Sequence, residues 1–99
     1  MTAFVVVDIS VENAKTYDQY KLLAPPSIAK FGGRYVARGG KTHTLEGSWQ
    51  PTRLVILEFP SVERAQSWWS SAEYAEAKAL RQRSASTKMV LIEGLEGAP

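Results

Sequence analysis

Three segments of the chain carry apolar side chains on both faces of the β-strands that they predict. Residues 3–11, 53–59 and 87–93 are rich in β-branched and aromatic residues, which is typical of strands. Side chains of a strand point alternately to its two faces. In the first segment the two alternating sets are Val5, Val7 and Ile9 on one face and Phe4, Val6 and Asp8 on the other. A stable monomer leaves only small apolar patches in water, so both faces of this sheet need a cover.

The segment after the first strand predicts a helix that stops early. Residues 12–24 have the period of an amphipathic helix. Pro25-Pro26 follows, and proline lacks an amide N–H and disfavours helical geometry in the preceding residue. We therefore expect the helix to break there, with a short further turn over 27–31 that ends at Gly32-Gly33.

The rest of the chain completes a β-α-β-β-α-β order. Residues 34–38 predict a second strand, and 41–52 predict a long connection to the third. Ser61 is a natural N-cap for the next helix, and Ser70-Ser71 marks a break in it. The order predicts a single α+β ferredoxin-like domain over residues 1–99: a four-stranded antiparallel sheet with the helices on one face.

Helices on one face leave the second apolar face of the sheet open. The economical cover is the sheet of a second copy, packed about 10 Å away. We therefore expect a homodimer or a higher oligomer. On the less apolar face we expect three charged residues among apolar neighbours: Asp8, Arg38 and Glu58. Such charges either pair within the space between sheets, point at a polar ligand, or reach water at strand ends.

Composition excludes several classes of function. The 12 Lys and Arg residues against 10 Asp and Glu residues give a net charge of +2 that is spread along the chain, which argues against a nucleic-acid partner. There is no cysteine for disulfides, thiolate metal sites or nucleophiles. No apolar run approaches the roughly 20 residues that span a membrane, and no basic leader starts the chain. The expectation is a soluble cytoplasmic protein.

Few residues carry recognisable catalytic chemistry. His43 is the only histidine, and it lies in the long loop with no neighbouring carboxylate in sequence to orient it. It is a candidate base, with a surface role as the alternative. We expect no metal, because one histidine without cysteine or clustered carboxylates makes a poor ligand set, and no cofactor. No G-x-S-x-G elbow is present.

Tryptophans form the main aromatic features. Adjacent helical residues point in different directions, so one of Trp68-Trp69 should be buried against the sheet and the other should lie at its boundary. Core packing and an aromatic wall for a ligand are the two interpretations of this pair. Trp49, near Pro51, is expected to anchor the long loop or a partner chain.

Several short motifs in order resemble the DUF1330 family of unknown function. They are Phe31-Gly32-Gly33-Arg34-Tyr35, Ala37-Arg38-Gly39-Gly40, Leu45-Glu46-Gly47, Glu58-Phe59-Pro60-Ser61, Glu73-Tyr74 and Leu80-Arg81. The resemblance implies the dimeric α+β barrel superfamily, in which two ferredoxin-like sheets close a barrel. That superfamily includes cofactor-independent oxygenases, isomerases, dehalogenating enzymes and haem-degrading enzymes, and a shared fold does not transfer a reaction.

Two functional hypotheses follow, and the sequence leaves open whether the chain is an enzyme. In the first, the homodimer binds a small organic ligand in a pocket between sheet and helices, with or without cofactor-independent catalysis. Arg38 or Arg53 would bind an anionic or carbonyl oxygen, and Glu58 or Asp8 would accept a proton. The remaining candidates for ligand binding are Tyr74, Arg81 and Trp69. In the second, the chain is a non-enzymatic dimerisation module with a closed, dry interior.

Overall fold

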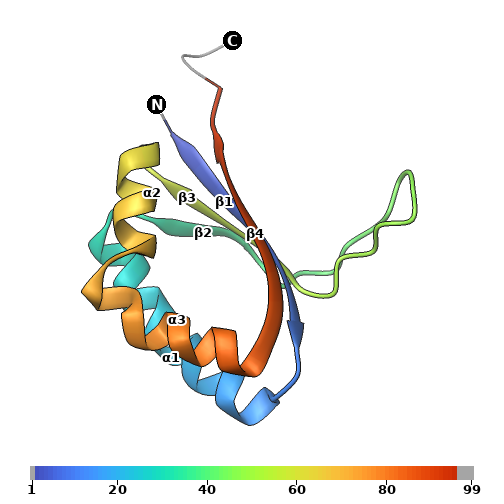
Figure 1. Cartoon of the computed structure of the whole chain (residues 1–99). Coiled ribbons are helices and arrows are strands. Elements are labelled where there is room, and N and C mark those ends of the chain that lie inside the picture. Colours follow the sequence, from blue (N-terminus) through green and yellow to red (C-terminus); the bar gives the residue numbers. More distant parts are fainter. Residues whose placement is uncertain (1, 96–99) are drawn as a thin grey trace.

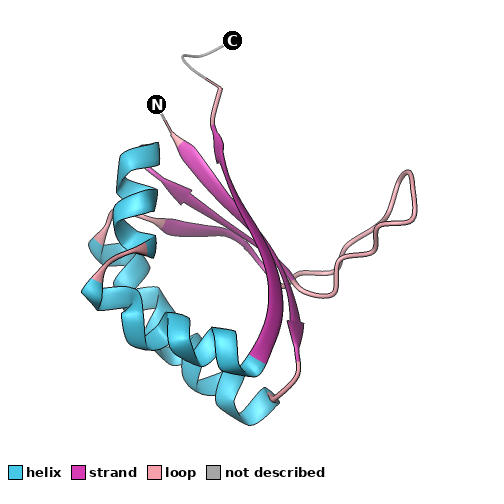
Figure 2. Ribbon diagram, viewed as in Figure 1, coloured by secondary structure: helices cyan, strands magenta, loops and turns pink. Residues whose placement is uncertain are grey.

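The computed structural model describes residues 2–95 and contains one four-stranded antiparallel sheet with three helices on one of its faces (Figures 1 and 2). The strand order is β2-β3-β1-β4, which is the ferredoxin-like arrangement predicted from the sequence. The elements are β1 (Ala3–Val11), α1 (Ala14–Lys30), β2 (Arg34–Arg38), β3 (Leu54–Phe59), α2 (Val62–Trp69), α3 (Ala72–Ser84) and β4 (Ala85–Glu93).

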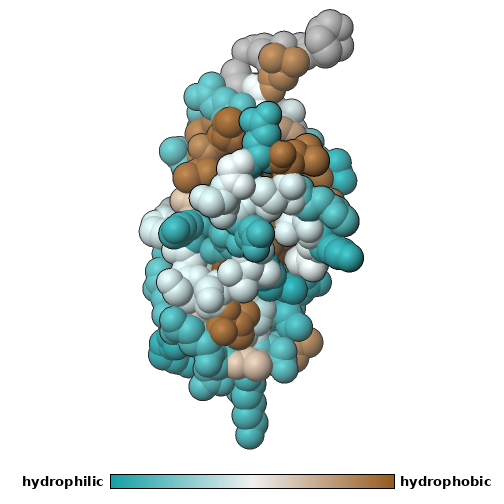
Figure 3. All heavy atoms as spheres, turned by 90° about the vertical axis from the view of Figure 1, so that its right-hand side faces the viewer, coloured by the Kyte–Doolittle hydropathy of each residue, from teal (hydrophilic) through white to brown (hydrophobic). Residues whose placement is uncertain are grey.

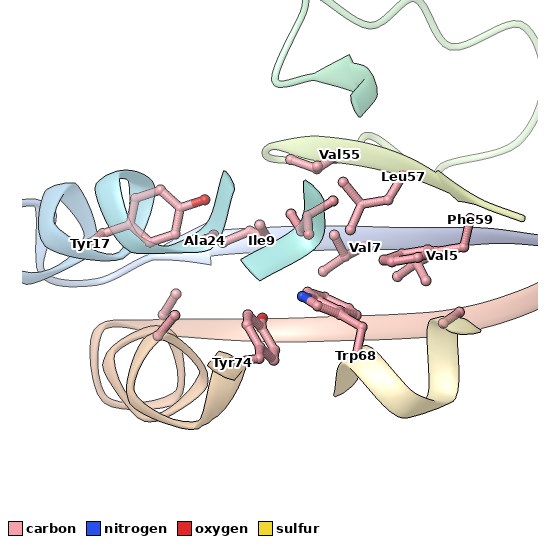
Figure 4. Close-up of a cluster of buried hydrophobic side chains, with 14 residues drawn as sticks. Val5, Val7, Ile9, Tyr17, Ala24, Val55, Leu57, Phe59, Trp68 and Tyr74 are labelled. Atoms are coloured by element: carbon pink, nitrogen blue, oxygen red, sulfur yellow. The ribbon is translucent and has the colours of Figure 1, made fainter. Parts of the chain in front are cut away.

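The central strand β1 shows how the two faces differ. It pairs with β3 on one side and β4 on the other, with Val5 opposite both Leu57 and Leu91. The set that begins with Val5 is buried beneath the helices (Figure 4), whereas the alternating set is only half-buried. Within residues 2–95 no helix covers the other face, and we call it the helix-free face.

Helix α1 does not break at its prolines, in contrast to the sequence-based expectation. It begins at the N-cap Asn13 and continues through Pro25-Pro26 to Lys30. An interior proline costs about 3 kcal/mol of helix stability. Packing outweighs this cost, because the turn that follows the prolines buries Ser27 and Ile28 against the body of the protein. The helix ends at Lys30 with Phe31 as its C-cap, and the predicted glycine follows at Gly32, whose φ of 79° suits glycine.

A β-bulge in β2 moves Arg38 to the opposite face from the one expected. Tyr35 pairs with Leu57 and Ala37 pairs with Ile56, so one extra residue is inserted in β2. Beyond the bulge the alternation is shifted, and Arg38 pairs with the buried Val55. The expectation that Arg38 shares the helix-free face with Glu58 is therefore wrong.

Trp68 is the largest side chain of the core and joins α2 to its neighbours. Its ring lies between those of Phe59 and Tyr74, with centroids 5.3 and 4.1 Å away (Figure 4). Its Nε1 donates a hydrogen bond to Ser27 Oγ at 3.1 Å. Trp68 is 1 % exposed and Trp69 is 44 % exposed, so the predicted division of the pair is confirmed.

We expect Trp68→Phe to lower the free energy of unfolding by about 2 kcal/mol, because it leaves a gap in the core and removes the hydrogen bond to Ser27. Urea unfolding followed by circular dichroism measures the change. The matched control is Trp69→Phe at the boundary, for which we expect a change within about 0.5 kcal/mol. Equal costs for the two variants would contradict this account of the core.

Candidate functional site

All four tyrosines of the chain gather with three arginines on the helix-covered side of the sheet, where Arg81 is buried, Arg53 is half-buried and Arg38 is exposed. We call this group the Arg–Tyr cluster; its members are Tyr17 and Tyr20 of α1, Tyr35 and Arg38 of β2, Arg53 before β3, and Tyr74 and Arg81 of α3. Figure 4 shows the rings of Tyr17 and Tyr74 pointing into the layer between the sheet and the helices. The cluster contains four of the residues proposed from the sequence: Arg38, Arg53, Tyr74 and Arg81.

Arg81 lies at the inner end of the cluster. Its side chain is 3 % exposed and comes from the last turn of α3, where the carbonyl end of the helix favours a cation. One terminal nitrogen donates to Thr87 Oγ1 at 2.6 Å, and Nε donates to Tyr74 Oη at 3.3 Å. The Tyr74 hydroxyl in turn bonds the Tyr20 hydroxyl at 3.1 Å. A chain of hydrogen bonds thus connects β4, α3 and α1.

Arg53 forms a second branch of the cluster near the end of β2. Its Nε donates to Tyr17 Oη at 3.1 Å, and the Tyr17 ring lies 5.4 Å from that of Tyr20. The guanidinium passes over Gly39, where a Cβ would overlap it. Gly39 has a φ of 72°, so both its backbone conformation and this close contact favour glycine. The Gly39-Gly40 turn therefore helps to place Arg53.

Arg38 binds a carbonyl oxygen that a proline leaves without its helical partner. In an α-helix the N–H of residue 25 would donate to the carbonyl of residue 21, and Pro25 has no N–H. A terminal nitrogen of Arg38 donates to this Lys21 oxygen at 3.0 Å. The same guanidinium lies 4.5 Å from the centre of the Tyr35 ring, as a cation–π pair. Pro25 and the bulge in β2 therefore act together to position Arg38.

The cluster carries positive charge without a neighbouring carboxylate. Within residues 2–95, the ion pairs are Lys21–Asp18, Lys30–Glu73 and Arg34–Glu58, and none involves Arg38, Arg53 or Arg81. A buried cation is costly unless it is paired and hydrogen-bonded, and Arg81 has only two hydroxyl groups as side-chain partners. An anionic group that entered the cluster would balance this charge.

Burial raises the pKa of two phenols of the cluster, Tyr20 and Tyr35. Burial is the largest cause that raises the pKa of Tyr20 far above its ordinary value, and Tyr74 raises it further by charge and hydrogen bonding. Arg81 opposes this shift in the pKa of Tyr20. Burial likewise raises the pKa of Tyr35, against an opposing effect of Arg38. At neutral pH the Tyr20 and Tyr35 hydroxyls therefore stay protonated and can donate hydrogen bonds.

An open cavity adjoins the cluster without containing its polar groups. It has a volume of about 400 Å³, lies between α2 and β4, and is mainly apolar. Its walls include Val5, Ala65, Trp68, Trp69, Met89 and Leu91. The space within the cluster itself is about 20 Å³, enough for a single water. Trp68 and Met89 line both spaces, so these two side chains separate the cavity from the arginines.

The candidate proton acceptors from the sequence lie away from the cluster. Asp8, on the helix-free face, accepts hydrogen bonds from Trp49 Nε1 at 3.2 Å and from the Thr52 amide at 3.0 Å. Glu58 pairs with Arg34 across β2 and β3 on the same face. His43 is exposed in the loop between β2 and β3. The structure therefore does not bring any of these three together with Arg38 or Arg53.

Tyr17, Tyr20, Tyr35 and Met89 belong to the site but are not among the residues predicted from the sequence. Tyr17 and Tyr20 lie in the segment 12–24, which the sequence predicts only as an amphipathic helix. One signal was available in the sequence, because all four tyrosines fall within predicted helices or strands. Tyrosine with its hydroxyl buried needs a hydrogen-bond partner, which points to a shared polar cluster.

Among residues 2–95, no three histidine or acidic side chains gather as the ligands of a metal ion would. Over the same residues, no helix combines the length and apolar character needed to cross a lipid bilayer.

Comparisons with known proteins agree with this architecture. A family model described as a domain of unknown function, DUF1330, matches residues 2–95. No curated protein matches the sequence.

Solved structures with the same fold cover nearly the whole chain. A protein of unknown function from Rhodopseudomonas palustris is 20 % identical over 97 % of this chain and 84 % of its own, with a TM-score of 0.77. A dimeric ferredoxin-like protein of unknown function from a Jannaschia species is 10 % identical over 95 % and 100 %, with a TM-score of 0.71. SnoaB, a cofactor-independent oxygenase from Streptomyces nogalater, is 10 % identical over 99 % and 96 %, with a TM-score of 0.62. These likenesses confirm the fold.

The link between Pro25 and Arg38 predicts a coupling that a double-mutant cycle measures. Pro25→Ala restores an N–H that can bind the Lys21 carbonyl oxygen, so Arg38→Ala should cost less in that background. We expect a coupling of about 0.5–1.5 kcal/mol in the free energy of unfolding. The matched control replaces Pro26, for which we expect additive effects with Arg38→Ala. Additivity in both cycles would contradict the link.

The raised pKa of Tyr20 predicts a loss of stability in alkali. Its neutral form stabilises the fold fully below pH 10, where tyrosine of the unfolded chain titrates, and this contribution declines as the pH rises further. Between pH 9.5 and 11, we expect the free energy of unfolding of the parent to fall about 1 kcal/mol more than that of Tyr20→Phe. Urea unfolding at several pH values measures both slopes. Parallel slopes would show that Tyr20 titrates normally.

Proposed function

The chain belongs to the DUF1330 family, whose domain has no assigned function, and we propose that it is a homodimer that binds a small organic molecule bearing an anionic or carbonyl oxygen. The single observation that carries the proposal is the set of three arginines without a carboxylate partner within residues 2–95, next to a cavity of about 400 Å³. Apolar pockets with a few convergent polar groups are the usual form of small-molecule sites.

The proposed ligand has an apolar part and a polar end. The apolar part would occupy the cavity between α2 and β4, where Trp69 stands at the rim. The polar end would reach the Arg–Tyr cluster past Met89, an unbranched side chain that adapts easily to a ligand. Arg38, Arg53 and Arg81 would supply positive charge there, and Tyr74 would orient the oxygen by hydrogen bonding.

The homodimer in this proposal forms through the helix-free face. Val90 and Ile92 of β4 and Val36 of β2 are exposed on it. Two solved relatives of the fold, from the Jannaschia species and from Bacteroides fragilis, are described as dimeric. Two such faces packed together would bury their apolar side chains and form the two sheets of a dimeric α/β barrel.

An enzymatic form of the proposal uses the same groups. Arginines and neutral phenols that stabilise a bound oxyanion also stabilise one that develops during a reaction. SnoaB, which has the same fold, is a cofactor-independent oxygenase. Asp8, Glu58 and His43 are not part of this proposed site, since they lie on the helix-free side of the sheet or in the loop.

A second candidate function is a non-enzymatic dimerisation module. The observation that favours it is the small space of about 20 Å³ within the cluster, where hydroxyls and guanidinium groups satisfy one another. In that case the cluster is only a polar part of the core, and the cavity between α2 and β4 stays empty of ligand.

Ligand binding is tested with a series of aromatic and aliphatic carboxylates, titrated against the fluorescence of the tryptophans that line the cavity. We expect binding to strengthen with apolar size, and Arg38→Met or Arg53→Met to weaken it at least tenfold by removing a charge-assisted contact. The matched control is Arg34→Met, because Arg34 pairs with Glu58 on the opposite face of the sheet. Ala65→Leu, which fills the cavity, should also weaken binding.

Two outcomes would contradict the proposal. Binding that is unchanged in both arginine variants would show that the cluster does not hold the ligand. If no carboxylate binds, and a crystal structure of untreated protein shows no co-purified molecule between α2 and β4, the dimerisation module is the better account.

A further inference from the structure

The loop between β2 and β3 forms an arm that stands away from the body of the protein. It comprises residues 40–52, and residues 40–50 are all exposed. Figure 1 shows it projecting from the sheet on the side opposite the helices. Loops of this length without secondary structure are uncommon in compact domains unless they are functional. The arm lies on the same side of the sheet as the helix-free face.

The arm has a defined shape although it hardly touches the rest of the chain. Asp8 holds its base, through Trp49 Nε1 and the Thr52 amide. Near the tip, the Thr44 hydroxyl donates to the Trp49 carbonyl oxygen at 2.9 Å. Gly47, with a φ of 79°, makes the turn. Ordering a loop costs conformational entropy, and these few contacts recover little of it within one chain.

Apolar side chains on the arm continue the apolar surface of the helix-free face. Leu45 is 93 % exposed and Trp49 is 62 % exposed. Trp49 also lines an apolar groove of about 350 Å³ on that face, together with Val6, Leu54 and Val90. Figure 3 views the molecule from this side and shows hydrophobic side chains in separate groups among hydrophilic ones. Trp49 thus joins the arm to the groove on the helix-free face, and Leu45 lies further out on the arm.

The reach of the arm exceeds the distance between two packed sheets. Gly47 lies six steps along the chain before Arg53, which directly precedes β3, and six steps span up to about 20 Å. Sheets that pack face to face lie about 10 Å apart. An arm that stands off the face is therefore long enough for its tip to pass the plane of a second sheet.

We propose that in the homodimer each arm crosses the interface and packs its tip, through Leu45, against the second copy of the chain. The inference rests on the homodimer of the proposed function and adds a contact that the sheets alone do not make. A second copy fits better than another occupant, because the arm and groove are continuous with the face that the second sheet covers. The interface then holds the arm in the shape that Asp8 and Gly47 set up.

The test compares Leu45→Asp with the parent chain by sedimentation velocity over a range of concentrations. Leu45 is almost fully exposed, so its replacement leaves the fold of each protomer intact. We expect the dissociation constant of the dimer to rise at least tenfold, because two arms lose an apolar contact and gain a charge. The matched control is Leu22→Asp, which changes a leucine that is 77 % exposed on α1, and should dimerise like the parent.

A second measurement follows the tip of the arm directly. The chain has no cysteine, so Leu45→Cys accepts a single dye that is sensitive to polarity. We expect its emission to shift to shorter wavelength in the dimer and to return when dilution separates the protomers, whereas a dye at Leu22→Cys should not respond. If the dimer is stable, Leu45→Asp does not weaken it and the dye does not respond, the arm contact is wrong. The face-to-face dimer would then still be supported. A parent that stays monomeric at all concentrations overturns both.

Discussion

Apolar side chains stand on both faces of the four-stranded sheet, and the helices lie on only one of them. On the covered face, Trp68 packs between Phe59 and Tyr74 and fixes α2 and α3 against the strands. The other face keeps Val36, Val90 and Ile92 exposed within the described chain. Removing such a surface from water is the main driving force for association between proteins. The unequal cover therefore accounts both for the enclosed cluster and for the proposed self-association.

Two local departures from regular structure place the polar residues of the site. The bulge in β2 turns Arg38 toward the helices, and Pro25 leaves the Lys21 carbonyl oxygen free to accept its hydrogen bond. Each departure has a cost, since a bulge interrupts the ladder of the sheet and an interior proline weakens a helix. Both departures help to place the guanidinium group of Arg38. Such departures concentrate at functional sites, which agrees with a ligand-binding role for the Arg–Tyr cluster.

The arginines of the cluster and the apolar cavity lie in different places, and this arrangement decides which kind of ligand fits. Arg81 is buried and Arg53 is half-buried where little space remains, with Arg38 exposed beside them, whereas the cavity of about 400 Å³ is apolar, and Trp68 and Met89 stand between the two regions. The hydrogen bond to Ser27 holds Trp68 in place, so Met89 is the side chain between the two regions that can change conformation to admit a ligand. A ligand with an apolar part and an anionic end uses both regions. A smaller anion would gain little from the cavity, and a purely apolar molecule would gain little from the arginines.

Short-range periodicity and local hydrogen bonds are enough to predict from the sequence the order of the elements, the apolar sets of the strands, the cap at Ser61 and the ferredoxin-like fold. The continuation of α1 through its prolines follows instead from tertiary packing, since burial of the following turn offsets a local cost. The face of Arg38 and the gathering of all four tyrosines likewise emerge only in the folded chain. A single inserted residue reverses every later side chain of a strand, and contacts between distant segments leave no periodic trace in the sequence.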